Sequence, residues 1–146
     1  MEFVLLSEKH VKQIADLEKQ YFSAPWSEKS IAEEIKNSLS LWVVAVDEDT
    51  VVGYVGSQTV LFEADMMNLA VDRSYRRQGI ARKLVSFLID RLRENKTYSL
   101  TLEVCASNVA AISLYHELGF KEVGRRPRYY SKPVEDALIL RKEWEV

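Results

Sequence analysis

Hydrophobic positions recur with two different periods along the chain, and each period predicts a different kind of element. A spacing of three and four residues gives a helix one buried stripe, whereas alternation gives a strand one buried face. The helical spacing occurs in segments 11–21, 31–35 and 80–92. Ser7 and Ser27 precede the first two segments, and serine is a favourable helix cap. We therefore expect three amphipathic helices.

Short apolar runs rich in β-branched residues predict strands in the first half of the chain. These runs cover residues 3–6, 41–46, 51–57 with its continuation 58–62, and 66–71. The acidic segment 47–50 predicts a hairpin between two of them, and a further turn is expected at Glu63–Ala64. An antiparallel meander should therefore lead the chain to Val71.

The segment that joins this meander to the third helix has the chemistry of an anion site. It ends at Gly79, directly before the helical spacing begins. A glycine lets the main chain approach a ligand closely, and the first N–H groups of a helix have no partner within it. Arg76, Arg77 and Arg82 surround that point. The glycines of a dinucleotide loop and the Gly-Lys-Ser/Thr of a P-loop are missing, so an ordinary solvated helix start stays an alternative.

Segment 98–104 alternates apolar and polar positions, which predicts another strand. It follows a crossover helix, so it should lie parallel to the strand that ends at Val71. Glu103 would place a carboxylate on this strand beside the core. Such burial is costly, so the side chain should serve a cleft or lie at an exposed strand end.

Asn108 is a favourable N-cap for a short helix over 109–118 that stops at Gly119. Tyr115 lies on the apolar face of this helix, so it should point inward or into a groove. A buried tyrosine needs a hydrogen-bond partner for its hydroxyl. That partner could be a backbone group or, in an enzyme, a reacting atom.

Composition narrows the function classes. The 146 residues fit a single domain, residues 1–146, and 20 basic against 22 acidic residues make no basic field for nucleic acid. Acidic residues stand near the N-terminus, and no apolar run reaches membrane-spanning length. We therefore expect a soluble, cytoplasmic protein with neither a nucleic-acid nor a membrane partner. The single cysteine, Cys105, has no second cysteine to pair with, and no metal site is predicted.

Several motifs together resemble the GNAT acetyltransferase superfamily. The pattern R-x-x-G-x-A that ends at Ala81, after a strand ending Asn-Leu-Ala-Val, resembles its acetyl-coenzyme A loop. The pattern N-x-x-A-I-x-L-Y-x-x-x-G-F from Asn108 to Phe120 strengthens the resemblance. Further motifs resemble the branch that acetylates the N-terminal alanine of a ribosomal protein: Pro25-Trp26-Ser27, Glu103 with Tyr115, Tyr129-Tyr130 and Glu135-Asp136-Ala137.

The resemblance implies an α/β fold, a single GNAT acyl-CoA N-acyltransferase domain whose mixed central sheet is flanked by helices on both faces and splays near Val71 and Val104. Acetyl-CoA would be the acetyl donor, with its pyrophosphate on the backbone amides of the loop and its pantetheine arm along the preceding strand. The implied contacts are Leu69, Ala70, Val71, Arg77, Gln78, Gly79, Ile80, Ala81, Arg82 and Asn108.

The same resemblance implies a catalytic pair, with Glu103 as general base and Tyr115 as the acid that protonates the leaving thiolate. Direct attack by the amine is expected, because no Ser-His-Asp spacing is present and no histidine is placed by sequence beside Cys105. The implied partner is the N-terminus of a small-subunit ribosomal protein. Glu33 and Glu34 of the second helix are expected to attract its basic residues.

Two other functions stay open on the sequence. A GNAT enzyme that acetylates a small amine, such as a polyamine or an antibiotic, would have a closed acidic pocket. A non-catalytic acyl-CoA binding domain would need neither Glu103 nor Tyr115, so the presence of both favours an enzyme.

Overall fold

The computed structural model describes residues 1–131 and 133–146. In chain order the elements are β1 (Glu2–Leu5), the 3-10 helix η1 (Glu8–His10), α1 (Val11–Tyr21), α2 (Glu28–Lys36), β2 (Ser40–Asp47), β3 (Thr50–Val60), β4 (Glu63–Val71), the 3-10 helix η2 (Arg73–Tyr75), α3 (Ile80–Glu94), β5 (Ser99–Cys105), α4 (Val109–Glu117), β6 (Lys121–Ser131) and β7 (Val134–Glu143). The expected helices and the meander are confirmed.

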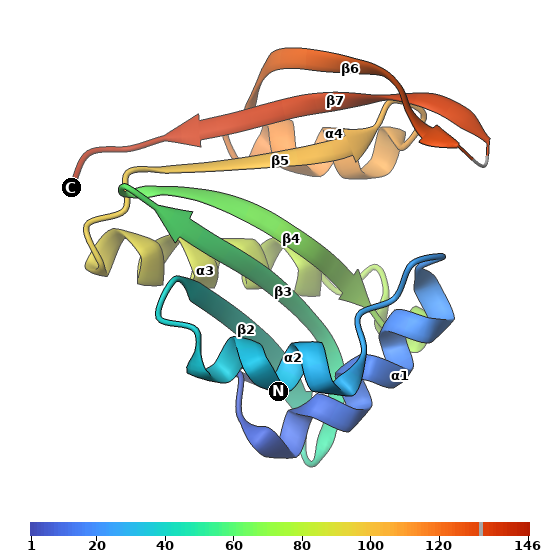
Figure 1. Ribbon diagram of the computed structural model, residues 1–146, viewed down its shortest axis with the longest axis vertical. Helices are drawn as coiled ribbons and strands as arrows, with labels where there is room; N and C mark the ends of the chain where they lie inside the picture. Colours follow the sequence, from blue (N-terminus) through green and yellow to red (C-terminus); the bar gives the residue numbers. More distant parts are fainter. Residues whose placement is uncertain (132) are drawn as a thin grey trace.

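The seven strands form one sheet in the order β1-β2-β3-β4-β5-β7-β6 (Figure 1). Only the β4–β5 pair is parallel, as the crossover through α3 requires. Two hydrophobic clusters hold the helices to the sheet. One contains α1 and α2, and the other contains α3 and α4. The helices therefore cover both faces of a mixed sheet, as expected.

The two parallel strands separate along their length, and this separation makes room for a ligand. Their ladder consists of three pairs, Glu63 with Ser99, Ala64 with Leu100 and Asp65 with Thr101. Beyond these pairs β4 and β5 diverge, as Figure 1 shows on its right-hand side. The expected splay is confirmed, but it begins before Val71 and Val104. Within residues 1–131 and 133–146, the β5-facing edge of β4 consequently has no strand partner from Met66 onward.

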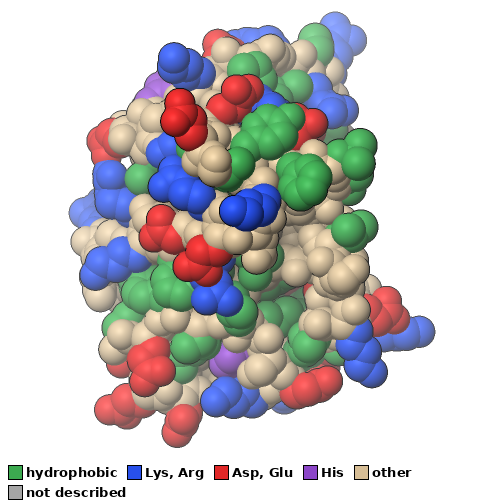
Figure 2. All heavy atoms as spheres, turned by 90° about the vertical axis from the view of Figure 1, so that its left-hand side faces the viewer, with side chains coloured by type: hydrophobic (Ala, Val, Ile, Leu, Met, Phe, Trp, Pro, Cys, Tyr) green, Lys and Arg blue, Asp and Glu red, His purple; other side chains and the backbone are tan. Residues whose placement is uncertain are grey.

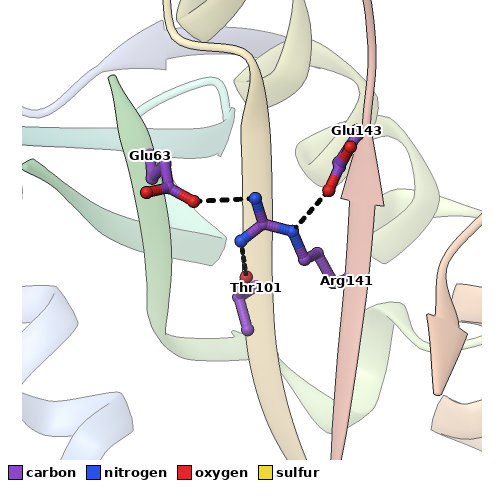
Figure 3. A network of polar contacts seen from close by, with 4 residues as sticks. All are labelled: Glu63, Thr101, Arg141 and Glu143. Carbon is purple, nitrogen blue, oxygen red and sulfur yellow. Dashed lines mark hydrogen bonds and ion pairs between the residues drawn. The ribbon is translucent and has the colours of Figure 1, made fainter. Parts of the chain in front are cut away.

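A polar network ties the strands together at the paired end of the splay (Figure 3). Arg141 on β7 reaches across β5, and its Nη2 lies 2.7 Å from Oε1 of Glu63 on β4. The same guanidinium donates to Thr101 Oγ1 at 3.3 Å and to Glu143 at 2.9 Å. One planar cation thus bridges three strands where the ladder still holds.

The turn between β3 and β4 lies at Leu61–Phe62, so the expected turn at Glu63–Ala64 was wrong. Val60 pairs with Glu63 across a two-residue loop whose residues have φ of 51° and 67°. Hairpin turns of this kind favour asparagine and glycine because both central residues need positive φ. Two large apolar side chains therefore occupy positions that carry no turn signal in the sequence.

Replacing Leu61-Phe62 by Asn-Gly should stabilise the protein. Both side chains are exposed, at 83% and 58%, so little burial is lost, while the strain of positive φ is relieved. We expect the melting temperature to rise by about 2–4 °C for each kcal/mol gained. Scanning calorimetry measures this shift, and an unchanged or lower melting temperature would contradict the assignment of strain to this turn.

The C-terminal hairpin of β6 and β7 was not predicted. Its strands pair from Lys121 with Arg141 to Ser131 with Val134, with irregularities at 122–124 and 126–130. The arginine-rich β6 is almost wholly exposed, so it lacks the alternation that marks a half-buried strand. Figure 2 shows the face at the paired end of the splay, where acidic and basic side chains are interspersed. Among the described residues, no helix is long and apolar enough to cross a membrane.

Candidate active site

A cavity of about 500 Å³ begins where the β4–β5 ladder ends. Its lining comes from β4, β5 and the β6 end of the C-terminal hairpin: Asp65, Met66, Met67, Asn68, Thr101, Leu102, Glu103, Arg126, Tyr129 and Tyr130. A larger cavity of about 560 Å³ lies beside the β3–β4 turn, but none of the predicted site residues lines it. The chemistry of the lining therefore identifies the cavity at the splay as the candidate site.

Glu103 projects from β5 into this cavity, as a cleft residue would. Its Oε1 lies 3.2 Å from Nε of Arg126 on β6, and its side chain is 29% exposed. The other oxygen, Oε2, is buried and has no hydrogen-bond partner within the described part of the chain. Buried polar atoms are normally paired. Oε2 therefore lacks a donor, and the Glu103 side chain that carries it lines the cavity.

Asp65 is a second carboxylate of the cavity, and the sequence analysis did not identify it. Asp65 stands opposite Thr101 in the ladder. Thr101 lies two residues before Glu103 on β5 and therefore on the same face of the sheet, so Asp65 and Glu103 share that face. Partial burial raises the pKa of Asp65, and the negative charges of Glu103 and Glu63 raise it further. The cavity is therefore an electrostatically negative pocket that favours a cation.

Tyr115 approaches the splay from the opposite face of the sheet. It lies on α4 in the cluster with α3, is 6% exposed, and its hydroxyl lies 3.8 Å from the sulfur of Met66. Met66 in turn lines the cavity. Burial raises the pKa of Tyr115 to about 12, so the hydroxyl keeps its proton at neutral pH. The expected inward direction of Tyr115 is confirmed, and its role as an acid stays a proposal.

The loop before α3 has the backbone of an anion site. Gly79 is the N-cap of α3 with φ of 74°, and a β-carbon built there would meet no protein atom within 4 Å. The amide of Lys83 is bonded to the Gly79 carbonyl, so the amides of Ile80, Ala81 and Arg82 precede the first helical bond. These three N–H groups and the open space beside Gly79 suit a phosphate.

Two of the three arginines near this loop have partners within the protein. Arg76 lies over the Tyr21 ring at 5.0 Å, and Arg82 forms an ion pair with Glu117 of α4. Asn108 caps α4 as expected, with Oδ1 accepting from the Ala111 amide at 3.2 Å. Leu69, Ala70 and Val71 occupy the part of β4 whose β5-facing edge is open. The predicted cofactor residues thus lie on the open part of β4, at the start of α3 and at the cap of α4.

Glu34 does not face an acceptor, contrary to expectation. It is 7% exposed and accepts hydrogen bonds from Ser40 at 2.8 Å, Trp42 at 3.1 Å and Gln58 at 3.0 Å, with a fourth from Asn37. Burial raises the pKa of Glu34, but these bonds lower it by more, so the carboxylate is ionised. Its charge is satisfied inside the fold, where it joins α2 to β2 and β3.

Comparison with known proteins agrees with this architecture. The model of the acetyltransferase (GNAT) family matches residues 11–120, most of the chain. The chain belongs to the GNAT acetyltransferase family.

Sequence similarity to individual GNAT proteins extends over nearly the whole chain. The [ribosomal protein bS18]-alanine N-acetyltransferase of Salmonella typhimurium is 37% identical over 93% of this chain and 93% of its own length. The crystal structure of the corresponding Escherichia coli enzyme has a TM-score of 0.90, with 35% identity over 99% of this chain and 94% of that one. An uncharacterised Mycobacterium leprae protein is 38% identical over 94% of this chain. The match covers only 39% of the length of the Mycobacterium leprae protein.

Proposed function

We propose that this GNAT domain transfers the acetyl group of acetyl-CoA to the N-terminal α-amine of a ribosomal protein that begins with alanine, namely bS18. The observation that carries the proposal is the Glu103 carboxylate, which lines a cavity beside the open edge of β4 and has one oxygen, Oε2, without a hydrogen-bond partner in the described part of the chain. The proposal also places the protein in the cytoplasm, where ribosomal proteins are made. The two bS18-alanine N-acetyltransferases that this chain resembles support the choice of acceptor.

The donor fits the surface that runs from β4 to α3. The open β4 edge at Leu69 to Val71 offers backbone groups to the amides of the pantetheine arm, as an added strand would. The pyrophosphate would bind the N–H groups after Gly79. A backbone N–H of the same strand segment would polarise the thioester carbonyl. Holding both substrates in one cleft makes the attack effectively unimolecular.

The reaction needs one proton removed and one supplied. The amine nitrogen attacks the thioester carbon, the new C–N bond forms, and the C–S bond breaks. Glu103, directly or through water, takes the proton from nitrogen, and the Tyr115 hydroxyl donates to the departing sulfur. The two groups reach the splay from opposite faces of the sheet, so base and acid do not compete for one position.

A single carboxylate base suits an α-amine better than a lysine. An α-amine with a pKa near 7.8 is roughly 10–15% neutral at pH 7, whereas a lysine near 10.4 is under roughly 0.1% neutral. The lysine route therefore needs far more deprotonation from the same base. This difference favours an N-terminal acceptor over an internal side chain.

Three peptides test the acceptor. With acetyl-CoA, we expect one acetyl group on the terminus of a bS18 peptide that begins with alanine. We expect none on the same peptide with a blocked α-amine and a free internal lysine, and none on a peptide that begins with proline. Mass spectrometry locates the product. Acetylation of the blocked peptide would contradict the N-terminal proposal, and activity on a polyamine alone would favour a small-molecule enzyme.

A further inference from the structure

A buried carboxylate behind the cavity is not used by the mechanism above. Glu18 of α1 is 0% exposed, yet it contacts three other segments. It accepts from the backbone N–H of Trp26 at 2.9 Å and from the hydroxyl of Tyr54 on β3. It also accepts from Nδ2 of Asn68 on β4 at 2.9 and 3.0 Å. Glu18 therefore joins α1, the segment before α2, and two strands at one point.

The chemistry of Glu18 determines how the Asn68 amide is turned. All the partners of Glu18 are donors, so both of its carboxylate oxygens act as acceptors. Burial and the adjacent carboxylate raise the pKa of Tyr54, so its hydroxyl keeps the proton it donates. Only the NH₂ group of Asn68 can face Glu18. The carbonyl oxygen Oδ1 must then face away from it.

The direction in which Asn68 points is set by an irregularity in the sheet. Val55 pairs with Leu69 and Ser57 with Met66, so Met67 and Asn68 together oppose the single residue Gly56. Such a bulge re-aims side chains and is frequent beside active sites. Here it lets Asn68 contact Glu18 while it lines the same cavity as Glu103. Oδ1 makes no hydrogen bond within the described residues.

We propose that Asn68 binds the acceptor, with Oδ1 accepting a hydrogen bond from the α-amine, and that Glu18 is a positioning residue that acts through Asn68. The inference rests on the proposed function. In the neutral amine, Oδ1 of Asn68 and the carboxylate of Glu103 would accept hydrogen bonds from the two N–H groups, so the remaining lone pair would point toward the thioester carbon. As the C–N bond forms, Glu103 would take the proton of the N–H group that it holds. The hydrogen bonds from Asn68 Nδ2 to both carboxylate oxygens of Glu18 keep the Asn68 amide from rotating.

Kinetics with the alanine peptide test the role of Asn68. Asn68→Leu keeps the size of the side chain but removes the acceptor oxygen, so kcat/KM for the peptide should fall about tenfold or more. The affinity for acetyl-CoA, measured by calorimetry, should stay unchanged, because the proposed donor contacts are Leu69 to Val71 and the start of α3 and do not include the Asn68 side chain. Glu18→Gln should produce a smaller loss, since a glutamine amide no longer dictates which end of Asn68 faces the cavity.

A reciprocal exchange separates positioning from simple structural support. In Glu18→Gln combined with Asn68→Asp, the glutamine NH₂ can donate to the new aspartate, whose second oxygen again faces the amine. We expect the double variant to recover kcat/KM to within about threefold of the parent. This value is far above the one expected if the separate losses of Glu18→Gln and Asn68→Asp simply multiplied. Glu34→Gln is the matched control. It disturbs a comparable buried carboxylate with several donors, but Glu34 does not line the cavity, so the melting temperature should fall while the KM for the peptide stays unchanged.

The outcomes separate this inference from the proposed function. A parent enzyme that acetylates the alanine peptide, together with Asn68→Leu as active as the parent, would overturn the inference alone. Failure of the double variant to recover activity beyond Glu18→Gln, with both variants folded by calorimetry, would overturn the positioning role of Glu18. A parent enzyme that is silent on the alanine peptide would overturn the proposed function and the inference together.

Discussion

Replacing Glu103 by glutamine is expected to lower turnover by about 10²-fold or more at pH 7, because general-base catalysis contributes that much and an amide cannot take the proton. The variant should fold, since its cavity position and its size are kept and Arg126 is half exposed. Steady-state thiol release measures the loss. Glu122→Gln on the exposed surface of β6 is the matched control and should keep the parent rate.

The pH profile of the Glu103→Gln variant should separate a lost base from a damaged site. The acceptor loses its own proton as the pH rises through the α-amine pKa of about 7.8. The variant should therefore regain part of its rate between pH 7 and about pH 9, and its deficit relative to the parent should shrink. A variant as fast as the parent at pH 7 would refute the base role. A deficit that is constant with pH would indicate misplacement of the acceptor instead.

Replacing Gly79 by valine should weaken acetyl-CoA binding by about tenfold or more, because one lost backbone contact to a phosphate and the added bulk both act on the ligand. The new β-carbon would meet no protein atom within 4 Å, so its methyl groups occupy the space where the pyrophosphate is expected. Calorimetry measures the dissociation constant. Unchanged affinity would remove the loop from the donor site.

A matched control is needed because valine at positive φ strains the backbone by itself, by about 1–2 kcal/mol. Gly119, which ends α4 with φ of 94°, supplies that control. Gly119→Val should lose comparable stability while keeping the affinity for acetyl-CoA. If both variants lose affinity for acetyl-CoA, the loss in Gly79→Val is explained by general destabilisation of the fold and not by a contact with the pyrophosphate.

The local patterns predicted most of the first 120 residues correctly. Amphipathic spacing located α1, α2 and α3, and alternation located β5 with Glu103 on the face opposite its apolar residues. The helix start at Gly79 and the cap by Asn108 also followed from residue type. In these cases the preference for a helix, a strand or a cap depends on residues close together in the chain, so it can be predicted from the sequence.

The failures share a different origin. The turn at Leu61–Phe62 has no turn residues, and register between β3 and β4 sets its place. Asp65 and Asn68 looked like ordinary strand residues until the ladder put Asp65 opposite Thr101 and the bulge turned Asn68 toward Glu18. A buried acid such as Glu18 cannot be recognised from a helical pattern, which records hydrophobicity and not partners.

The sequence by itself predicted most of the elements before the C-terminal hairpin, because periodicity, caps and glycine act within a few residues of the chain. Its resemblance to the GNAT superfamily supplied the proposed donor loop and the proposed catalytic pair. Only the tertiary structure decided which carboxylates are enclosed by the protein and which line the cavity. Donors from the strands surround Glu34 and Glu18, whereas Glu103 lines the cavity and has one oxygen without a partner among the described residues. That difference arises from contacts between residues distant in sequence, and such contacts depend on strand register and on the angle at which β4 and β5 separate.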